Sequence, residues 1–282
     1  PGKGNYPLSA NCVLFATVVV APSSTLRLAT TIAALKTVGP SVLSARGSSS
    51  LFEVYGSNLT LVDVVLRGGK GANGGCLFVS GNAQAHLIGT TIRGCQAVRN
   101  GGAVFVQGMG ASIVLEGAAI EECIANKGAG GGIFVKDNAR VVVVANTSIL
   151  RNNSADEKSG GGLYIQETGN LTITGSGAHF LLEGNSARDY GGGLYADDGA
   201  TVLVSAGALV EIKYNEALEK SGGGAHLDKA AAATITGSGT RFVLENNTAH
   251  RGGGLDIRSG STVEVLSGAI VEAKGNTAHT YG

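Results

Sequence analysis

The chain has no tryptophan, one methionine and four prolines among 282 residues, and charged residues make up only 15% of it. Lysine plus arginine and aspartate plus glutamate balance at 21 each. Without a net charge or a basic run, we expect neither nucleic acid nor an anionic membrane surface as a partner. No apolar stretch reaches the roughly 18 residues of a membrane-spanning helix, so the sequence predicts no membrane span.

Helical periodicity is also lacking, because no segment repeats apolar residues at the spacing of a helix face. The longest apolar run, "CVLFATVVVA" from Cys12 to Ala21, has the length of a signal-peptide core, but its β-branched residues favour a buried strand. The chain starts at Pro1 rather than Met, so we expect a processed chain or a fragment. Residues 1–40 are interpreted as an irregular N-terminal segment with the first coils, and residues 41–282 as repeats of the same domain.

Glycine, in contrast, is abundant, with 46 residues. Glycine pairs recur at intervals of 27, 30, 30, 31, 31 and 30 residues, beginning at Gly74, Gly101, Gly131, Gly161, Gly192, Gly223 and Gly253. A fixed period of this size is typical of a solenoid. The chain stops at Gly282, where another glycine cluster is due, so we expect the array to continue beyond it.

Each period contains three runs of strand length, for example "GGLYA", "TVLVS" and "ALVEIKY", separated by turn-forming residues. Three short strands per ~30 residues predict an all-β fold, a parallel β-helix of about nine coils. The usual handedness of parallel crossovers predicts a right-handed helix. The glycines precede the first strand, where they permit close backbone approach. A phosphate-binding loop would require Gly-Lys-Ser/Thr before a helix, and neither is present.

The corner after the third strand carries columns of equivalent residues. The reference positions are Cys95, Cys123, Asn153, Asn185, Asn215, Asn247 and Asn276. Alanine always follows two residues later, and an apolar residue precedes by three. We expect the apolar residues to point into the coil and the asparagines to adopt a left-handed turn, with amides bonded along the stack.

A second column alternates in charge. Two residues before the reference positions lie Arg93, Glu121, Arg151, Glu183, Lys213, Glu245 and Lys274. In parallel strands stacked in register, these side chains would be direct neighbours on the outer face, where opposite charges stabilise and like charges destabilise. The alternation also accounts for a longer sequence repeat of two coils, such as "TITGSG" at Thr172 and again at Thr234.

The segments "GGAVFV", "GGIFV" and "GGLYI", with "FLLEGNSA" and "FVLENNTA", resemble right-handed parallel β-helix repeats. They are most similar to the chlamydial-type polymorphic outer-membrane protein repeats, which carry GGAI and FxxN motifs. The resemblance covers residues 65–282, and "LFEVYGSNLTLVDVVLRGG" looks like an earlier coil of the same class. It implies a secreted, surface-exposed passenger domain with an adhesive or structural role.

Four cysteines and five Asn-x-Ser/Thr sites favour an exported, glycosylated protein. Cys95 and Cys123 occupy equivalent positions in adjacent coils, near 5 Å apart, so we predict a disulfide between them; two buried thiols are the alternative. The pairing of Cys12 and Cys76 stays open. The predicted glycosylation sites are Asn58, Asn146, Asn152, Asn170 and Asn246.

One candidate binding surface is an aromatic stripe. Phe134, Tyr164 and Tyr195 occupy outward positions of the first strand, where an exposed stripe could stack on sugar rings or on a partner protein. Simple stacking along the helix is the alternative interpretation.

No catalytic or metal-binding set emerges from the spacing of residues. Polysaccharide lyases and hydrolases with a β-helix resemble this fold and use clustered acids, but Asp197 and Asp198 have no equivalent pair in neighbouring coils. We therefore interpret them as a solvated turn. His250 and His279 should stack in successive coils, too few ligands for a metal. The columns show no interruption after Asn153, and an enzyme would be expected to break them locally.

The sequence thus predicts a non-enzymatic extracellular or cell-surface module, a rigid segment of a larger surface or fibre-forming glycoprotein, with no cofactor. Its expected partners are polysaccharide or other cell-surface and fibre proteins, and end-to-end or lateral self-assembly is compatible with the fold. The alternative is a carbohydrate-binding or polysaccharide-degrading β-helix protein, because a fold by itself does not determine function.

Overall fold

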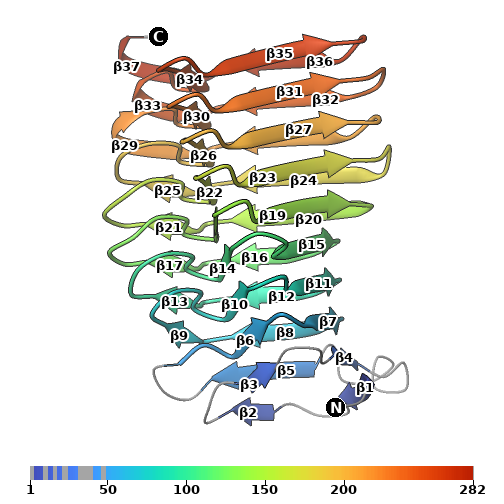
Figure 1. The fold of residues 1–282 in the computed structure, drawn as a ribbon. Helices are drawn as coiled ribbons and strands as arrows, with labels where there is room; N and C mark the ends of the chain where they lie inside the picture. The colour runs from blue at the N-terminus through green and yellow to red at the C-terminus, as the bar shows by residue number, and fades with distance from the viewer. Residues whose placement is uncertain are drawn as a thin grey trace.

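The computed structural model describes residues 3–8, 12–14, 18–20, 25–30, 41–45 and 49–281. Within these residues the regular structure is β-strand throughout, and successive coils stack along one axis from the N-terminus to the C-terminus (Figure 1). The strands of neighbouring coils pair in parallel, residue against equivalent residue. A search of the same residues finds no helix with the length and apolar character needed to span a membrane.

Two long sheets face each other. Sheet A consists, in spatial order, of β1 (Lys3–Leu8), β4 (Thr25–Thr30), β7 (Asn58–Val62), β11 (Gln84–Ile88), β15 (Ser112–Glu116), β19 (Arg140–Val144), β23 (Asn170–Thr174), β27 (Thr201–Ser205), β31 (Ala232–Thr236) and β35 (Thr262–Leu266). Sheet B consists of β2 (Cys12–Leu14), β5 (Ser41–Ala45), β8 (Val64–Arg67), β12 (Thr91–Arg93), β16 (Ala119–Glu121), β20 (Asn146–Arg151), β24 (Ala178–Glu183), β28 (Leu209–Lys213), β32 (Arg241–Glu245) and β36 (Ile270–Lys274).

Two sheets of shorter strands close each coil. Sheet C consists of β3 (Val18–Val20), β6 (Phe52–Tyr55), β10 (Leu77–Ser80), β14 (Val104–Gln107), β18 (Ile133–Lys136), β22 (Leu163–Ile165), β26 (Leu194–Ala196), β30 (Ala225–Leu227) and β34 (Leu255–Ile257). Sheet D consists of β9 (Lys70–Gly71), β13 (Gln96–Ala97), β17 (Ile124–Ala125), β21 (Ser154–Ala155), β25 (Ser186–Ala187), β29 (Glu216–Ser221), β33 (Thr248–Arg251) and β37 (Thr277–Tyr281).

A coil therefore runs through sheets C, A, B and D in chain order. The three predicted strands correspond to sheets C, A and B, and the parallel solenoid is confirmed. The fourth strand was not predicted, because strands such as β21 and β25 have only two residues and show no alternation.

The core lies inside the coils, between the facing sheets. Ile120, Leu150 and Leu182 stack in register along sheet B and are at most 1% exposed. This inward apolar column is the one that the sequence predicts, and it follows from the alternation of side chains along a strand.

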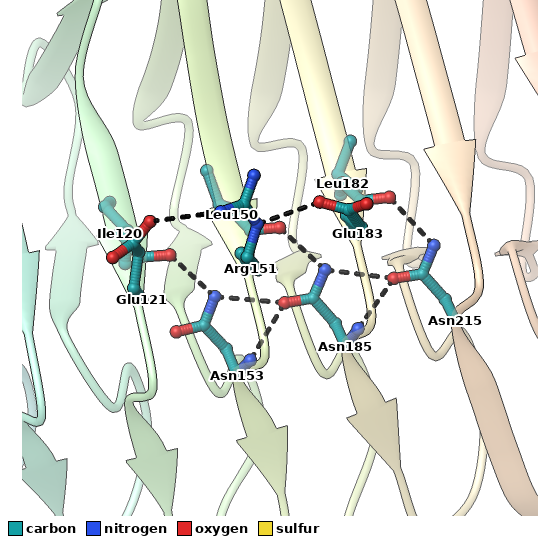
Figure 2. A network of polar contacts seen from close by, with 9 residues as sticks. All are labelled: Ile120, Glu121, Leu150, Arg151, Asn153, Leu182, Glu183, Asn185 and Asn215. Atoms are coloured by element: carbon teal, nitrogen blue, oxygen red, sulfur yellow. Dashed lines mark hydrogen bonds and ion pairs between the residues drawn. The ribbon is translucent and has the colours of Figure 1, made fainter.

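The asparagine column forms a continuous hydrogen-bonded ladder (Figure 2). The Nδ2 atom of Asn185 donates to the backbone oxygen of Leu150 at 2.9 Å and to Oδ1 of Asn215 at 3.0 Å. Oδ1 of Asn185 accepts from both the backbone N and the Nδ2 atom of Asn153, each at 3.0 Å. The predicted bonding along the stack is confirmed. The predicted left-handed conformation of the ladder asparagines is wrong. The residue before each of them adopts it instead, as Asn152 does with φ 52°.

The outer charged column is also in register from Arg93 to Lys274. Arg151 lies between two acids, 3.8 Å from Glu121 and 2.8 Å from Glu183 (Figure 2). Lys274 similarly pairs with Glu245 at 3.4 Å. Stacking in register is what converts the sequence alternation into neighbouring opposite charges.

The predicted Cys95–Cys123 disulfide is wrong. Cys95 is bonded to Cys76, with the two Cα atoms 5.7 Å apart, and this bond also excludes a Cys12–Cys76 pair. Cys123 is a buried free thiol whose Sγ atom accepts from the backbone N of Cys95 at 3.4 Å, and burial raises its pKa to about 12. Stacked side chains point in the same direction, whereas a disulfide needs Cβ atoms that converge to about 3.8 Å.

Candidate functional site

The predicted aromatic stripe exists but is not a surface. Phe134, Tyr164 and Tyr195 are 3%, 9% and 5% exposed, and they continue a column that starts at Phe78 and Phe105. The ring centroids of Phe134 and Tyr164 are 5.0 Å apart, and those of Tyr164 and Tyr195 are 4.7 Å apart. The expectation of exposure is therefore wrong, and the alternative of stacking along the helix is right.

The loops between sheets D and C bury these rings. Ala129 and Tyr190, which lie in such loops, pack against the aromatic column. The glycine at the end of this loop packs so closely on the following strand that a Cβ atom on Gly160 would lie 2.6 Å from Cβ of Tyr164. Gly160 also has a φ of 70°, which L-residues rarely adopt. The glycine column is thus explained by close backbone approach, as the sequence suggests.

Asp197 is the first polar group at the edge of this aromatic column. The sequence predicts a solvated turn for Asp197 and Asp198; Asp198 is exposed, but Asp197 is only 1% exposed. Oδ2 of Asp197 accepts from the hydroxyl of Tyr164 and from Nζ of Lys229, both at 3.1 Å. Burial raises the pKa of Asp197 despite the lysine. The same desolvation, together with the carboxylate, raises the pKa of Tyr164.

The aromatic column ends in polar residues. His226 follows Tyr195, and Asp256 follows His226, at equivalent positions of β30 and β34. His226 is fully buried and packs against the rings of Tyr190 and Tyr195, with centroid distances of 4.7 Å and 5.2 Å. Its Nδ1 atom lies 3.1 Å from Asp256 but is not aligned for a hydrogen bond, and Nε2 has no partner within the described residues. Burial lowers the pKa of His226 to about 4.

The register of sheet D changes near His226. Ala217 pairs with Ala249, but Ser221 then pairs with Arg251, so the register between β29 and β33 shifts. The cause is visible in the sequence. Four residues separate Ala217 from the next glycine triplet, whereas only His250 and Arg251 follow Ala249 before the next one. The predicted columns themselves stay in register after Asn153, including the alanines of sheet D, and the shift lies beyond Ala217, outside these columns.

This register shift leaves a lateral pocket of about 320 Å³. The lateral pocket is lined by Tyr190, Glu219, Lys220, Ser221, His250, Arg251, Arg258 and Thr280. Lys220 lies over the ring of Tyr190 at 4.7 Å and pairs with Asp189 at 3.1 Å. Arg258 pairs with Asp256 at 2.8 Å and donates to the hydroxyl of Ser221 at 3.0 Å. Charged side chains thus dominate a cleft that includes one aromatic ring, Tyr190, which packs against the aromatic column.

The lateral pocket was not predicted from the sequence. Most of its lining residues belong to strands β29, β33 and β37. The only signal in the sequence is the shortened spacing between Ala249 and its glycine triplet. A hydrolytic triad is not assembled there, because Ser221 donates no bond to His226 and accepts one from Arg258. Among the residues that the structure describes, no three His, Cys, Asp or Glu side chains gather as metal ligands. His250 and His279 are neighbours, with ring centroids 6.0 Å apart.

The five predicted glycosylation sites all reach the surface. Asn58, Asn146 and Asn152 are exposed, while Asn170 and Asn246 are half-buried. Asn152 and Asn246 occupy the same left-handed corner, immediately before the buried ladder asparagines. Their occupancy stays a prediction.

The family model described as the right handed beta helix region matches residues 41–280. The chain belongs to this family, and its solenoid is a right-handed parallel β-helix. The comparisons add no support for the finer resemblance to polymorphic outer-membrane protein repeats. A search of the curated proteins gave no match, and neither did a search of the solved structures.

Proposed function

We propose that this β-helix is an extracellular structural or adhesive module, a rigid segment of a larger cell-surface or fibre-forming glycoprotein. The observation that carries the proposal is the continuity of the asparagine ladder. Its amides from Asn153 to Asn276 link coil to coil through buried hydrogen bonds, and such networks rigidify a fold. Side chains arranged in this way serve the stack rather than a reaction.

Two further features support the extracellular part of the proposal. The Cys76–Cys95 disulfide is typical of oxidising compartments. The five sequons lie where an oligosaccharide can be attached, because none of their asparagines is buried. The motif resemblance to polymorphic outer-membrane protein repeats belongs to this proposal as well.

A second candidate function is saccharide binding at the lateral pocket. The observation that favours it is the register shift, because functional sites are where the local rules of a fold fail. The buried aromatic column removes the exposed stripe as a binding surface, so the lateral pocket is the place to test.

The test is a pull-down of the protein on a panel of neutral and acidic polysaccharides, scored for both retention and release of oligosaccharides. We expect no release, and electron microscopy should show rods of uniform width. Retention that is lost in the double variant Lys220→Ala, Arg251→Ala would establish the second candidate function. Turnover of any polysaccharide would overturn the structural proposal.

A further inference from the structure

The outer charged column of sheet B contains one pair of like charges. Arg67 of β8 pairs in register with Arg93 of β12, directly before the alternation begins. From Arg93 to Lys274 every neighbour in this column has the opposite sign. Like charges placed opposite each other in adjacent strands are destabilising, so this pair is a local exception to the rule that the rest of the column follows.

Nearby acidic side chains do not pair with both arginines. Arg93 is held by Glu122, with Nε–Oε2 and Nη2–Oε1 distances of 3.0 Å and 2.8 Å. Its neighbour in the column, Glu121, is paired with Arg151 instead. Arg67 is exposed, and its side chain forms no hydrogen bond or ion pair with any of the described residues. The planar fork of a free guanidinium is therefore presented to solvent beside a second arginine.

A surface pocket of about 480 Å³ lies at these two side chains. It is lined by Val65, Arg67, Gly68, Arg93, Gly94 and Glu122. Gly68 and Gly94 form its corner without side chains, and a Cβ atom on Gly94 would meet nothing within 4 Å. The corner beside the two arginines is thus open.

The geometry points to an oxyanion-binding site in this pocket, in which a sulfate or phosphate group bridges Arg67 and Arg93. Stacked strands are about 4.8 Å apart, so one tetrahedral anion can accept hydrogen bonds from both guanidinium groups. Its negative charge takes the place of the acidic residue that the alternation lacks between the two arginines. The site is independent of the proposed function and lies on a different sheet from the lateral pocket.

The experiment measures binding by isothermal titration calorimetry and unfolding by urea, at constant ionic strength, with chloride replaced by sulfate or phosphate. Wild type should bind either anion saturably and gain stability accordingly. Arg67→Gln should weaken anion affinity about tenfold or more. Arg67→Glu should abolish anion binding and should be more stable than wild type when chloride is the only anion, because it restores the alternation.

Arg151→Gln is the matched control, because Arg151 stands in the same column between two acids. It should lose stability but keep the full response to sulfate. Glucose 6-sulfate and glucose 6-phosphate, compared with glucose and the free ions, distinguish an anion carried by a ligand from a free one. Equal sulfate responses in wild type, Arg67→Gln and Arg67→Glu would overturn the proposal, since general exclusion of sulfate from protein surfaces stabilises all variants alike.

Discussion

At the scale of single residues, His226 is the clearest departure from its column. The five preceding coils, from Phe78 to Tyr195, place phenylalanine or tyrosine at this position, and His226 is buried next to Tyr195. A buried imidazole without a partner for Nε2 is costly, and burial disfavours its charged form. The stability of the fold should therefore depend on pH through this one side chain.

Replacing the imidazole by a ring that cannot be protonated tests this dependence. The pKa of His226 is lowered to about 4, whereas an unfolded histidine titrates near 6.5. Between these values the unfolded chain binds a proton that the folded chain does not, so stability is lost as the pH falls from about 6.5 to about 4. The shift corresponds to about 3 kcal/mol. His226→Phe should remove this loss, measured by urea unfolding between pH 7 and pH 4.

The control is His279→Gln, because His279 is exposed. It should follow the pH profile of wild type closely. If the wild-type and His226→Phe profiles remain parallel down to pH 4, then Asp256 keeps His226 charged in the folded protein and burial does not govern its pKa.

At the scale of elements, the asparagine ladder ties each sheet B corner to the coils on both sides. Removing one amide leaves two backbone groups of the preceding coil unpaired. Without Asn185, the backbone N of Asn153 loses its acceptor and the backbone oxygen of Leu150 loses its donor. Each buried unpaired polar group costs about 1–3 kcal/mol, so a ladder asparagine matters more than its own contacts suggest.

Asn185→Ala should lower the free energy of unfolding by about 3 kcal/mol or more, measured by chemical denaturation. Asn126→Ala is the matched control, since Asn126 is exposed and outside the ladder; it should change stability by less than about 0.5 kcal/mol. Similar effects of the two substitutions would mean that water replaces the missing amide, and that the ladder is not a dry network.

The elements also show what the sequence can and cannot predict. In-register stacking maps equivalent positions onto neighbours, so the apolar column at Leu150 and the alternating charges at Arg151 are predictable from spacing alone. The exposure of Tyr164 is not, because the loop that covers it is irregular in the sequence and packs only in three dimensions. The partner of Cys95 depends on the convergence of Cβ atoms. The lateral pocket depends on the different lengths of strands β29 and β33 before their glycine triplets.

At the scale of the whole molecule, the unit that repeats is two coils rather than one. One coil contributes an acid to the outer column of sheet B and the next contributes a base, so coils can be exchanged without a charge clash only in pairs. In a solenoid, stability is approximately a sum over coils and the interfaces between neighbours. When two coils become neighbours, their outer charges therefore attract if an even number of coils separated them in the sequence and repel if that number was odd.

Deleting coils tests this rule. Removing residues 124–153 takes out one coil and places Glu121 beside Glu183, whereas removing residues 124–185 takes out two coils and places Glu121 beside Lys213. Both deletions join Cys123 to the serine that begins a sheet D strand. Salt screens exposed charges, so added salt should stabilise the one-coil deletion relative to the full chain in urea unfolding, and the two-coil deletion should respond as the full chain does. The total loss of coils does not enter this comparison, because only the salt dependence is compared. If both deletions respond to salt in the same way, the alternating column contributes no net stability, and the two-coil repeat of the sequence has another physical origin.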